Sequence, residues 1–273
     1  MISHPQTADN VDVARARCRR YRKRILDLSQ KIGALHIAPA FSCLEMVDSI
    51  YHSLLRRKNP TEFKDIFLMS KGHGCMSQYV VLEDMGILSK ENLDAYCSNN
   101  GILGAHPDYG NPGIMASTGS LGHGMGMAVG MAYAEKLKNT DVKVYVVLSD
   151  GEFQEGSTWE AIMMAANLKL DNLVAFMDLN NFTGLEEISV GHPAFYPVGE
   201  KLSAFNWDCY EVNGHDSEEI IEAAKKLKDR PLLVVGQTIK GKGVSFMENV
   251  PIWHYRSPNP AEYEQALKEI ESI

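Results

Sequence analysis

The chain has 273 residues, of which 45% are hydrophobic and 23% charged, and it includes 22 glycines. This length and composition indicate a globular protein with one large domain and a well-buried core. The formal net charge of −8 argues against nucleic acid or an anionic membrane as the main partner, because both favour a basic surface.

The cysteines and the apolar segments bear on location. The five cysteines are widely separated and form no CxxC motif, so neither a disulfide framework nor a zinc site is predicted. We therefore expect a reducing, cytoplasmic environment. The amino terminus has no apolar segment typical of a signal peptide, and no stretch approaches the roughly 18 apolar residues of a membrane span. No membrane association is predicted.

Two helices are predicted in the first sixty residues. Residues 15–24 are rich in arginine, but apolar residues recur at spacings of three and four, which favours an amphipathic helix with its arginines on a solvated face. A second helix is predicted to begin at Ser42, whose hydroxyl has Glu45 in capping-box spacing. Asn59-Pro60 is expected to end it.

Strands and helices then alternate. Short apolar segments at 66–69, 144–149, 173–179, 209–212 and 232–235 predict strands, and helical patterns separate them. One of these helices is expected to begin at Asp216, with Glu219 in capping-box spacing. The order predicts an α/β fold with a mostly parallel sheet and helices on both faces. No linker divides the chain, so residues 1–273 are predicted to form a single domain.

Two polar residues follow neighbouring buried strands. Asp150 ends the strand 144–149, and Asn180 ends the strand 173–179. The segment between them predicts one crossover helix, with Ser157 and Glu160 in capping-box spacing. A right-handed crossover would place both side chains at the carboxyl edge of the sheet, where α/β proteins bind ligands. A carboxylate and an amide oxygen suit Mg²⁺ with open positions for a diphosphate.

A glycine-rich segment, residues 117–126, leads into a predicted helix. Its backbone N–H groups at a helix amino terminus would favour an anion. The segment does not match the dinucleotide fingerprint GxGxxG. Close packing of helices through its glycines is the alternative explanation, and the predicted metal pair favours a diphosphate.

These motifs carry a resemblance to a known family. Asp150-Gly151 and Asn180-Asn181 resemble the two parts of the thiamine diphosphate motif, with Ser149 in place of its first glycine. Five further strings occur in the order found in transketolases, and the similarity spans nearly the whole chain: Ser70-Lys71-Gly72-His73-Gly74, Gly104-Ala105-His106-Pro107-Asp108, residues 116–122, Asn213-Gly214-His215-Asp216 and Lys240-Gly241-Lys242-Gly243. The chain thus resembles the diphosphate-binding (PP) domain of transketolase.

The resemblance implies roles for individual residues. Asp150, Asn180 and the main-chain carbonyl of Phe182 would bind the divalent ion, which is Mg²⁺ or another such as Ca²⁺ or Mn²⁺. Thiamine diphosphate would meet a set of residues from several segments: His73, Gly119, Ser120, Leu121, Gly151, Glu152, Asn180 and His254. Four histidines would line the channel to the reactive carbon, where protons must move on and off sugar oxygens: His36, His73, His106 and His254.

Some positions differ from the family pattern. Around His36 the family favours glycine on both sides, whereas this chain has Leu35 before it and Ala38 two residues after it. Tyr255 follows His254 where the family has glycine. His123 lies near the diphosphate loop, where the family generally has glutamine. These differences concern the channel, so the resemblance does not define the sugars.

A thiamine enzyme of this family also needs a glutamate that protonates the aminopyrimidine. The resemblance places that glutamate in a pyrimidine-binding domain, which is expected, together with the carboxyl-terminal domain, on a partner chain. The protein is thus predicted to be the amino-terminal subunit of a split transketolase, with two copies of each chain in the assembly. Glu155 matches a family position at the subunit interface.

The predicted function is transfer of a two-carbon ketol unit from a ketose to an aldose, in concert with the partner chain and with sugars or sugar phosphates as substrates. Two alternative thiamine enzymes share the diphosphate domain: the α subunit of a 2-oxo acid dehydrogenase E1 component, and a carboligase like 1-deoxyxylulose-phosphate synthase. An alternative of another class is a non-catalytic interaction subunit.

Overall fold

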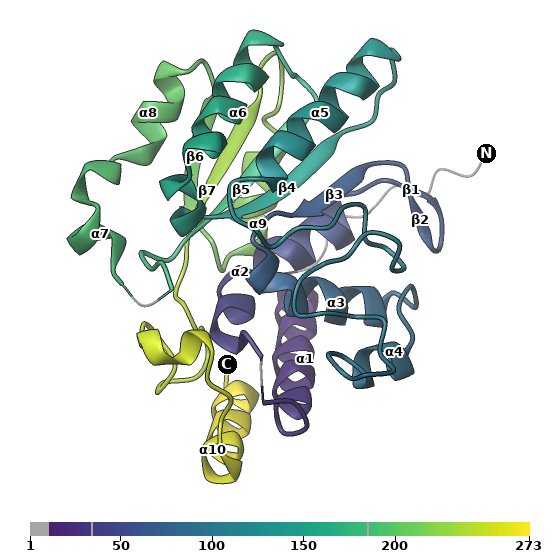
Figure 1. Cartoon of the computed structure of the whole chain (residues 1–273), viewed down its shortest axis with the longest axis vertical. Coiled ribbons are helices and arrows are strands. Elements are labelled where there is room, and N and C mark those ends of the chain that lie inside the picture. Colours follow the sequence, from purple (N-terminus) through teal and green to yellow (C-terminus); the bar gives the residue numbers. More distant parts are fainter. Residues whose placement is uncertain (1–10, 34, 185) are drawn as a thin grey trace.

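Five parallel strands form the central sheet of the computed structural model, which describes residues 11–33, 35–184 and 186–273 (Figure 1). The strand order is β3-β4-β5-β7-β6. The strands are β3 (Ile66–Met69), β4 (Val144–Ser149), β5 (Leu173–Leu179), β6 (Asp208–Asn213) and β7 (Leu232–Gln237). All four pairings are parallel. The five predicted strands are confirmed, with bounds that differ by at most two residues.

Helices cover both faces of the sheet, as the sequence predicts (Figure 1). Alternate residues of β4 point to opposite faces: Tyr145 and Val147 join one core, whereas Val146 and Leu148 join the other. The first core is shared with α1 (Val11–Ser29), α2 (Ile37–Ser49), α3 (Cys75–Asp84), α9 (Ser217–Ala224) and α10 (Pro260–Glu271). The second is shared with α5 (Gly124–Leu137), α6 (Gly156–Asn167) and α8 (Val198–Ala204).

The arginine-rich helix α1 differs from its prediction. The guanidinium of Arg17 forms a buried ion pair with Asp48 at 2.7 Å, and that of Arg22 forms one with Glu45 at 2.6 Å. These two arginines point inward to α2, so the helix does not present all its arginines to solvent. Because buried charges need paired partners, these contacts fix how α1 packs on α2.

The predicted capping residues are only partly correct. Helix α2 begins at Ile37, so Ser42 lies inside it, where its hydroxyl donates to Asp178 at 2.7 Å. The helix ends at Ser49 and is followed by a π-helical turn, Ile50–Leu54, and a hairpin, β1 (Arg57–Asn59) and β2 (Glu62–Phe63). The predicted end at Asn59-Pro60 is therefore wrong.

At α6, Ser157 does not cap the helix either, because its hydroxyl donates to the carbonyl of Gly122 at 2.8 Å. Asp216 does cap α9 and accepts from two backbone N–H groups. Its predicted capping box is incomplete, since Glu219 accepts from the N–H of Asn213 instead. In the two failed cases, long-range contacts of the serine outweigh the local pattern.

No helix in the described ranges combines the length and the apolar character needed to cross a membrane.

Candidate functional site

Asp150 and Asn180 meet at the carboxyl edge of the sheet. Ser149 of β4 is in register with Asp178 of β5, so the residues that follow these strands lie side by side. The Asp150 carboxylate is fully buried and accepts from the N–H of Asn181 at 2.6 Å and from that of Gly151 at 2.8 Å. The predicted juxtaposition of the two strand ends is present.

The amide of Asn180 is held in one orientation. Its Nδ2 donates to Ser42 Oγ at 3.1 Å and to Asp178 Oδ2 at 3.2 Å, whereas its Oδ1 accepts from the N–H of Phe182 at 3.0 Å. Both side chains that accept from Nδ2 are fully buried. The amide oxygen is therefore presented to the loop that also carries the Phe182 carbonyl.

Lys71 and Asp178 form an ion pair directly behind this amide. Both side chains are almost completely buried, and the Lys71 ammonium also donates to the carbonyl of Pro39 at 3.0 Å. Burial alone lowers the pKa of Lys71, but the neighbouring charge of Asp178 raises it above its usual value. Lys71 therefore stays charged, and its partner Asp178 accepts from Asn180 Nδ2.

The charge of Asp150 is unfavourable without a cation. Burial raises the pKa of Asp150 to about 7, with a further contribution from the charge of Asp178. A divalent ion beside the carboxylate would stabilise its ionised form. Among the residues described, no group of three or more His, Cys, Asp or Glu side chains is arranged to hold a metal. A metal here would need the amide and carbonyl oxygens as well.

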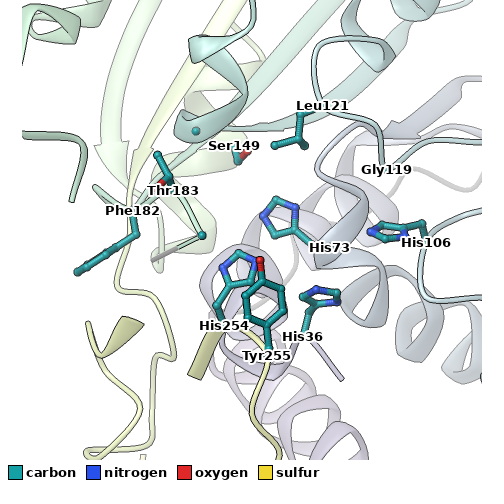
Figure 2. A pocket seen from close by; sticks show the side chains of 12 residues that line it. His36, His73, His106, Gly119, Leu121, Ser149, Phe182, Thr183, His254 and Tyr255 are labelled. Carbon is teal, nitrogen blue, oxygen red and sulfur yellow. The ribbon is translucent and has the colours of Figure 1, made fainter. Parts of the chain in front are cut away.

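A cavity of about 360 Å³ opens above this edge. Figure 2 shows Ser149, Leu121 and Thr183 toward one end of the cavity, and His36, His254 and Tyr255 toward the other. Segments far apart in the sequence contribute its lining. The complete lining is His36, His73, His106, Gly119, Leu121, Ser149, Gly151, Phe182, Thr183, Gly184, His254 and Tyr255.

All four predicted channel histidines lie in this cavity. His36 precedes α2, His73 lies in the 3₁₀ turn Gly72–Gly74, and His254 ends the 3₁₀ turn Pro251–His254. The ring centroid of His36 lies 5.9 Å from that of His106 and 5.4 Å from that of His254. The rings of His73 and His254 are stacked at 5.2 Å.

Three of these histidines are neutral at physiological pH. Burial, followed by nearby positive groups, lowers the pKa of His36 to about 4 and that of His254 to about 3, and it lowers the pKa of His73 well below its usual value. Among the residues that the structure describes, none forms a hydrogen bond with the buried Nδ1 atom of His36 or with that of His254. Such polar atoms are costly unless a ligand satisfies them.

The glycine-rich loop packs tightly against the site. Gly119 has a φ of +127°, and a Cβ there would lie 2.6 Å from the ring of His106. Gly122, with a φ of +84°, donates its N–H to Glu152 Oε1 at 3.0 Å. Side chains are thus excluded from both positions, and the loop leads into α5 at Gly124, as the sequence predicts.

Four predicted site residues do not line the cavity. Asp150 and Asn180 are buried and are not part of the lining. Asn180 and Phe182 both border an adjoining pocket of about 320 Å³. Ser120 is exposed. Glu152 is fully buried and accepts from Ser70 and from the N–H of Gly122, so it supports the loop from below. Burial raises the pKa of Glu152 to about 7.

Sequence reasoning missed several residues of the site. Thr183 and Gly184 line the cavity without having been predicted, whereas Tyr255, also in the lining, was named in the sequence as a departure at the channel. Lys240 donates to the carbonyls of Thr183 and Gly184 at 3.1 and 3.2 Å and so holds the loop that follows Phe182. Burial and the charge of Lys71 lower the pKa of Lys240 to about 8.

The residues fit a divalent ion and a diphosphate. Asp150, the oriented amide oxygen of Asn180 and the Phe182 carbonyl are hard donors of the kind that Mg²⁺ prefers. The Phe182 carbonyl oxygen lies 3.8 Å from the position that a Cβ on Gly151 would occupy, which brings it to the Asp150 turn. Gly151, Gly119 and Leu121 leave the adjacent surface open to a ligand.

Fold and site together define a class: an α/β protein with hard oxygen donors and a histidine-lined cavity at the carboxyl edge of a parallel sheet. Residues 14–264 match the family described as transketolase, thiamine diphosphate binding domain, and the chain belongs to this family. The predicted family and its cofactor are thereby confirmed. The match favours transketolase over the two alternative thiamine enzymes.

Several relatives are similar along their whole length. The chain is 39% identical to an apulose-4-phosphate transketolase subunit of Phocaeicola vulgatus, over 91% of this chain and 90% of that protein. It is 33% identical to the 6-deoxy-6-sulfo-D-fructose transketolase subunit SqwG of a Clostridium species, over 92% of this chain and 93% of that one.

Other relatives are longer. Human transketolase is 32% identical over 93% of this chain, which spans only 41% of the human protein. The crystal structure of transketolase from Campylobacter jejuni superimposes with a TM-score of 0.86 at 27% identity and covers 96% of this chain and 43% of that one. The predicted fold is confirmed by this likeness.

Proposed function

We propose that this chain is the diphosphate-binding subunit of a two-chain transketolase, which transfers a two-carbon ketol unit from a ketose to an aldose. Under this proposal residues 1–273 form a single PP domain, and a partner chain supplies the pyrimidine-binding domain and the activating glutamate. The observation that carries the proposal is the position of the oxygen donors of Asp150, Asn180 and Phe182 beside a cavity lined by four histidines.

The oxygen donors would bind a divalent ion and, through it, the diphosphate. Because Gly119 and Gly151 have no side chain, the cofactor could approach the backbone closely at both positions, and Leu121 would contact it. When bound, thiamine diphosphate supplies the nucleophilic carbon for ketol transfer.

The histidines would handle the sugar. A neutral imidazole has one N–H donor and one nitrogen acceptor, so it can bind either a hydroxyl or a carbonyl oxygen. His36 and His254 both line the cavity, and the ring of His73 stacks on that of His254. Their depressed pKa values keep these imidazoles neutral near pH 7, where they donate or accept hydrogen bonds without adding charge.

Names of similar proteins support the partner and the substrate class. Two relatives of matching length are called transketolase subunits, and their names specify an anionic ketose. We therefore propose sugar phosphates, or similarly charged sugars, as substrates and a heterotetramer with two copies of each chain. Glu155 is exposed next to Gly122, a position suited to the subunit interface. The five free cysteines fit a cytoplasmic location.

Reconstitution tests the proposal. The chain is purified alone and together with the product of a neighbouring reading frame that encodes a pyrimidine domain, and ketol transfer from a ketose phosphate to an aldose phosphate is measured. We expect turnover only from the complex, with thiamine diphosphate and Mg²⁺ present. Robust turnover by the single chain would refute the shared site. A complex that binds the cofactor but transfers no ketol unit would support the alternative of a non-catalytic subunit.

A further inference from the structure

Tyr255 lies with His36 and His254 at the end of the cavity opposite Ser149 and Leu121 (Figure 2). Its ring centroid lies 4.5 Å from that of His254 and 5.6 Å from that of His36. Its hydroxyl oxygen lies 3.4 Å from the position that a Cβ on Gly184 would occupy, so the side chain reaches from the histidines toward the loop after Phe182. Figure 2 shows the hydroxyl directed into the cavity. The phenol ring thus narrows this end of the cavity.

The hydroxyl of Tyr255 is available to a ligand. No residue within the described ranges forms a hydrogen bond with it, and 56% of the residue surface is exposed. A tyrosine hydroxyl that points into a cavity can both donate and accept. The imidazoles of His36 and His254 lie beside it and line the same cavity, so this end of the cavity is rich in hydrogen-bonding side chains.

The other unusual channel positions do not reach the cavity. Leu35 and Ala38 are almost completely buried, and neither is part of the lining. His123 is exposed, and its Nδ1 atom lies 3.2 Å from the carbonyl oxygen of Leu121. Ser149, which replaces a glycine of the family motif, lines the opposite end of the cavity (Figure 2). Of the departures around the channel, Tyr255 is the one that can touch a substrate at this end.

The charge of the lining limits which part of a sugar fits here. Among the described residues that line the cavity, there is no lysine, arginine, aspartate or glutamate. A phosphate or sulfonate would find no positive partner at this end, whereas hydroxyl groups would find several neutral ones. Carbon-bound hydrogens of a sugar can also pack on the face of the phenol ring.

We propose that Tyr255 is a specificity-determining residue that contacts the hydroxylated, uncharged carbons of the sugar beyond the transferred two-carbon unit. Its hydroxyl bonds a sugar hydroxyl, and its ring limits the bulk of substituents at these carbons. This inference rests on the proposed function in placing the sugar in this cavity.

The test uses the complex of this chain with its partner and two variants, the near-isosteric Tyr255→Phe and the truncated Tyr255→Gly. The donors are a straight-chain pentulose phosphate, a branched isomer of it, and hydroxypyruvate, which carries a ketol unit but no further hydroxylated carbon. Tyr255→Phe is expected to lower kcat/KM for the straight-chain pentulose phosphate about tenfold, as for loss of one hydrogen bond, and to change it less than about twofold for hydroxypyruvate. Tyr255→Gly is expected to shift selectivity at least about fivefold toward the branched isomer.

Tyr109 provides the matched control, because it is 74% exposed and lies outside the cavity lining. Tyr109→Phe and Tyr109→Gly should leave all three donors unchanged. The inference would be overturned if Tyr255→Phe lowered kcat/KM equally for hydroxypyruvate and for the pentulose phosphate. It would also be overturned if the Tyr109 variants changed kcat/KM as much as the Tyr255 variants. Tyr255→Phe keeps the shape of the side chain, so it remains informative if Tyr255→Gly does not fold.

A binding measurement separates this inference from the proposed function. A pentitol phosphate, which cannot react, is titrated calorimetrically into the wild-type complex and into Tyr255→Phe. If the variant binds the pentitol phosphate about tenfold more weakly, the role of Tyr255 is supported. This holds even if the wild-type complex transfers no ketol unit and the proposed function is wrong. Affinities that agree within about twofold would refute the contact, whether or not the complex is active.

Discussion

The side-chain nitrogen of Asn180 lies 3.2 Å from a carboxylate oxygen of Asp178, two residues earlier in the chain. Because Asp178 accepts only, this contact forces the amide to present its nitrogen to the interior and its oxygen to the loop at Phe182. The Lys71 ammonium pairs with Asp178 from the other side. A buried ion pair thus decides which atom of Asn180 a metal would meet.

The first prediction concerns this pair. Asp178→Asn should lower the free energy of unfolding by about 3–5 kcal/mol, because it leaves the buried charge of Lys71 without a counterion. It should also weaken Mn²⁺ binding by about 10–100-fold, since an amide at position 178 can either donate or accept and no longer fixes the orientation of Asn180. Urea unfolding and Mn²⁺ titration followed by electron paramagnetic resonance measure the two effects.

A double variant separates stability from metal binding. Lys71→Met combined with Asp178→Leu replaces the pair with apolar side chains, and it should recover most of the lost stability. It should not recover Mn²⁺ affinity, because Asn180 still lacks its acceptor. If both properties return together, Asp178 stabilises the fold without orienting Asn180.

Sequence reasoning reached those parts of the site that have local signals. Asp150 and Asn180 could be predicted because each ends a short apolar segment, and parallel strands bring such ends together. The Lys71–Asp178 pair could not, since its members are 107 residues apart and only the folded chain brings them together. The available signal was a single ionisable residue in the otherwise apolar strand Leu173–Leu179, which must have a partner when buried.

The capping errors have a similar origin. The spacing of Ser42 and Glu45 fits a capping box, yet Ser42 bonds Asp178 and Glu45 pairs with Arg22. Serine and glutamate have many possible partners, and sequence spacing records only the local ones. The strands were predicted more accurately than the helix starts because a fully buried strand needs only an apolar run.

The second prediction concerns acid stability. The folded-state pKa values of His36 and His254, about 4 and about 3, lie below the ordinary value of 6.5. As the pH falls below about 6.5, the unfolded chain binds protons at these two positions that the folded chain does not, so the two histidines contribute a decrease in the free energy of unfolding down to about pH 4. The raised pKa values of Asp150 and Glu152, both about 7, contribute in the opposite direction below about pH 7. Above about pH 6.5 both states are neutral at these positions and the effect is absent. Unfolding by urea across this pH range measures it.

Variants identify the groups responsible. His254→Gln should flatten the decrease in unfolding free energy between about pH 6.5 and 4, because the titrating group is removed. The same change at the exposed His192 should leave the profile as in the wild type. A profile for His254→Gln that matches the wild type would mean that other groups cause the acid sensitivity.

The third prediction concerns the glycine-rich loop. Gly119→Ala forces a side chain into a φ of +127° and places a Cβ 2.6 Å from His106, so the unfolding free energy should fall by about 1–3 kcal/mol. Thiamine diphosphate binding should weaken as well, because the loop and His106 must move apart. Gly126 is the matched control: a Cβ there meets nothing within 4 Å on helix α5, and Gly126→Ala should stabilise by about 0.5–1 kcal/mol.

The last prediction tests the metal ligand itself. Asp150→Asn keeps one of the two oxygens that accept from the N–H groups of Gly151 and Asn181, and it removes the one negative charge among the proposed donors. Mg²⁺-dependent binding of thiamine diphosphate should therefore fall by at least about 100-fold in calorimetry, since a hard divalent ion depends strongly on a charged ligand. Asp171→Asn, at an exposed carboxylate that pairs with Lys136, should leave the affinity unchanged. Equal cofactor affinity in Asp150→Asn and in the wild type would exclude Asp150 from the metal site, and the diphosphate would then have to be held by the glycine-rich loop alone.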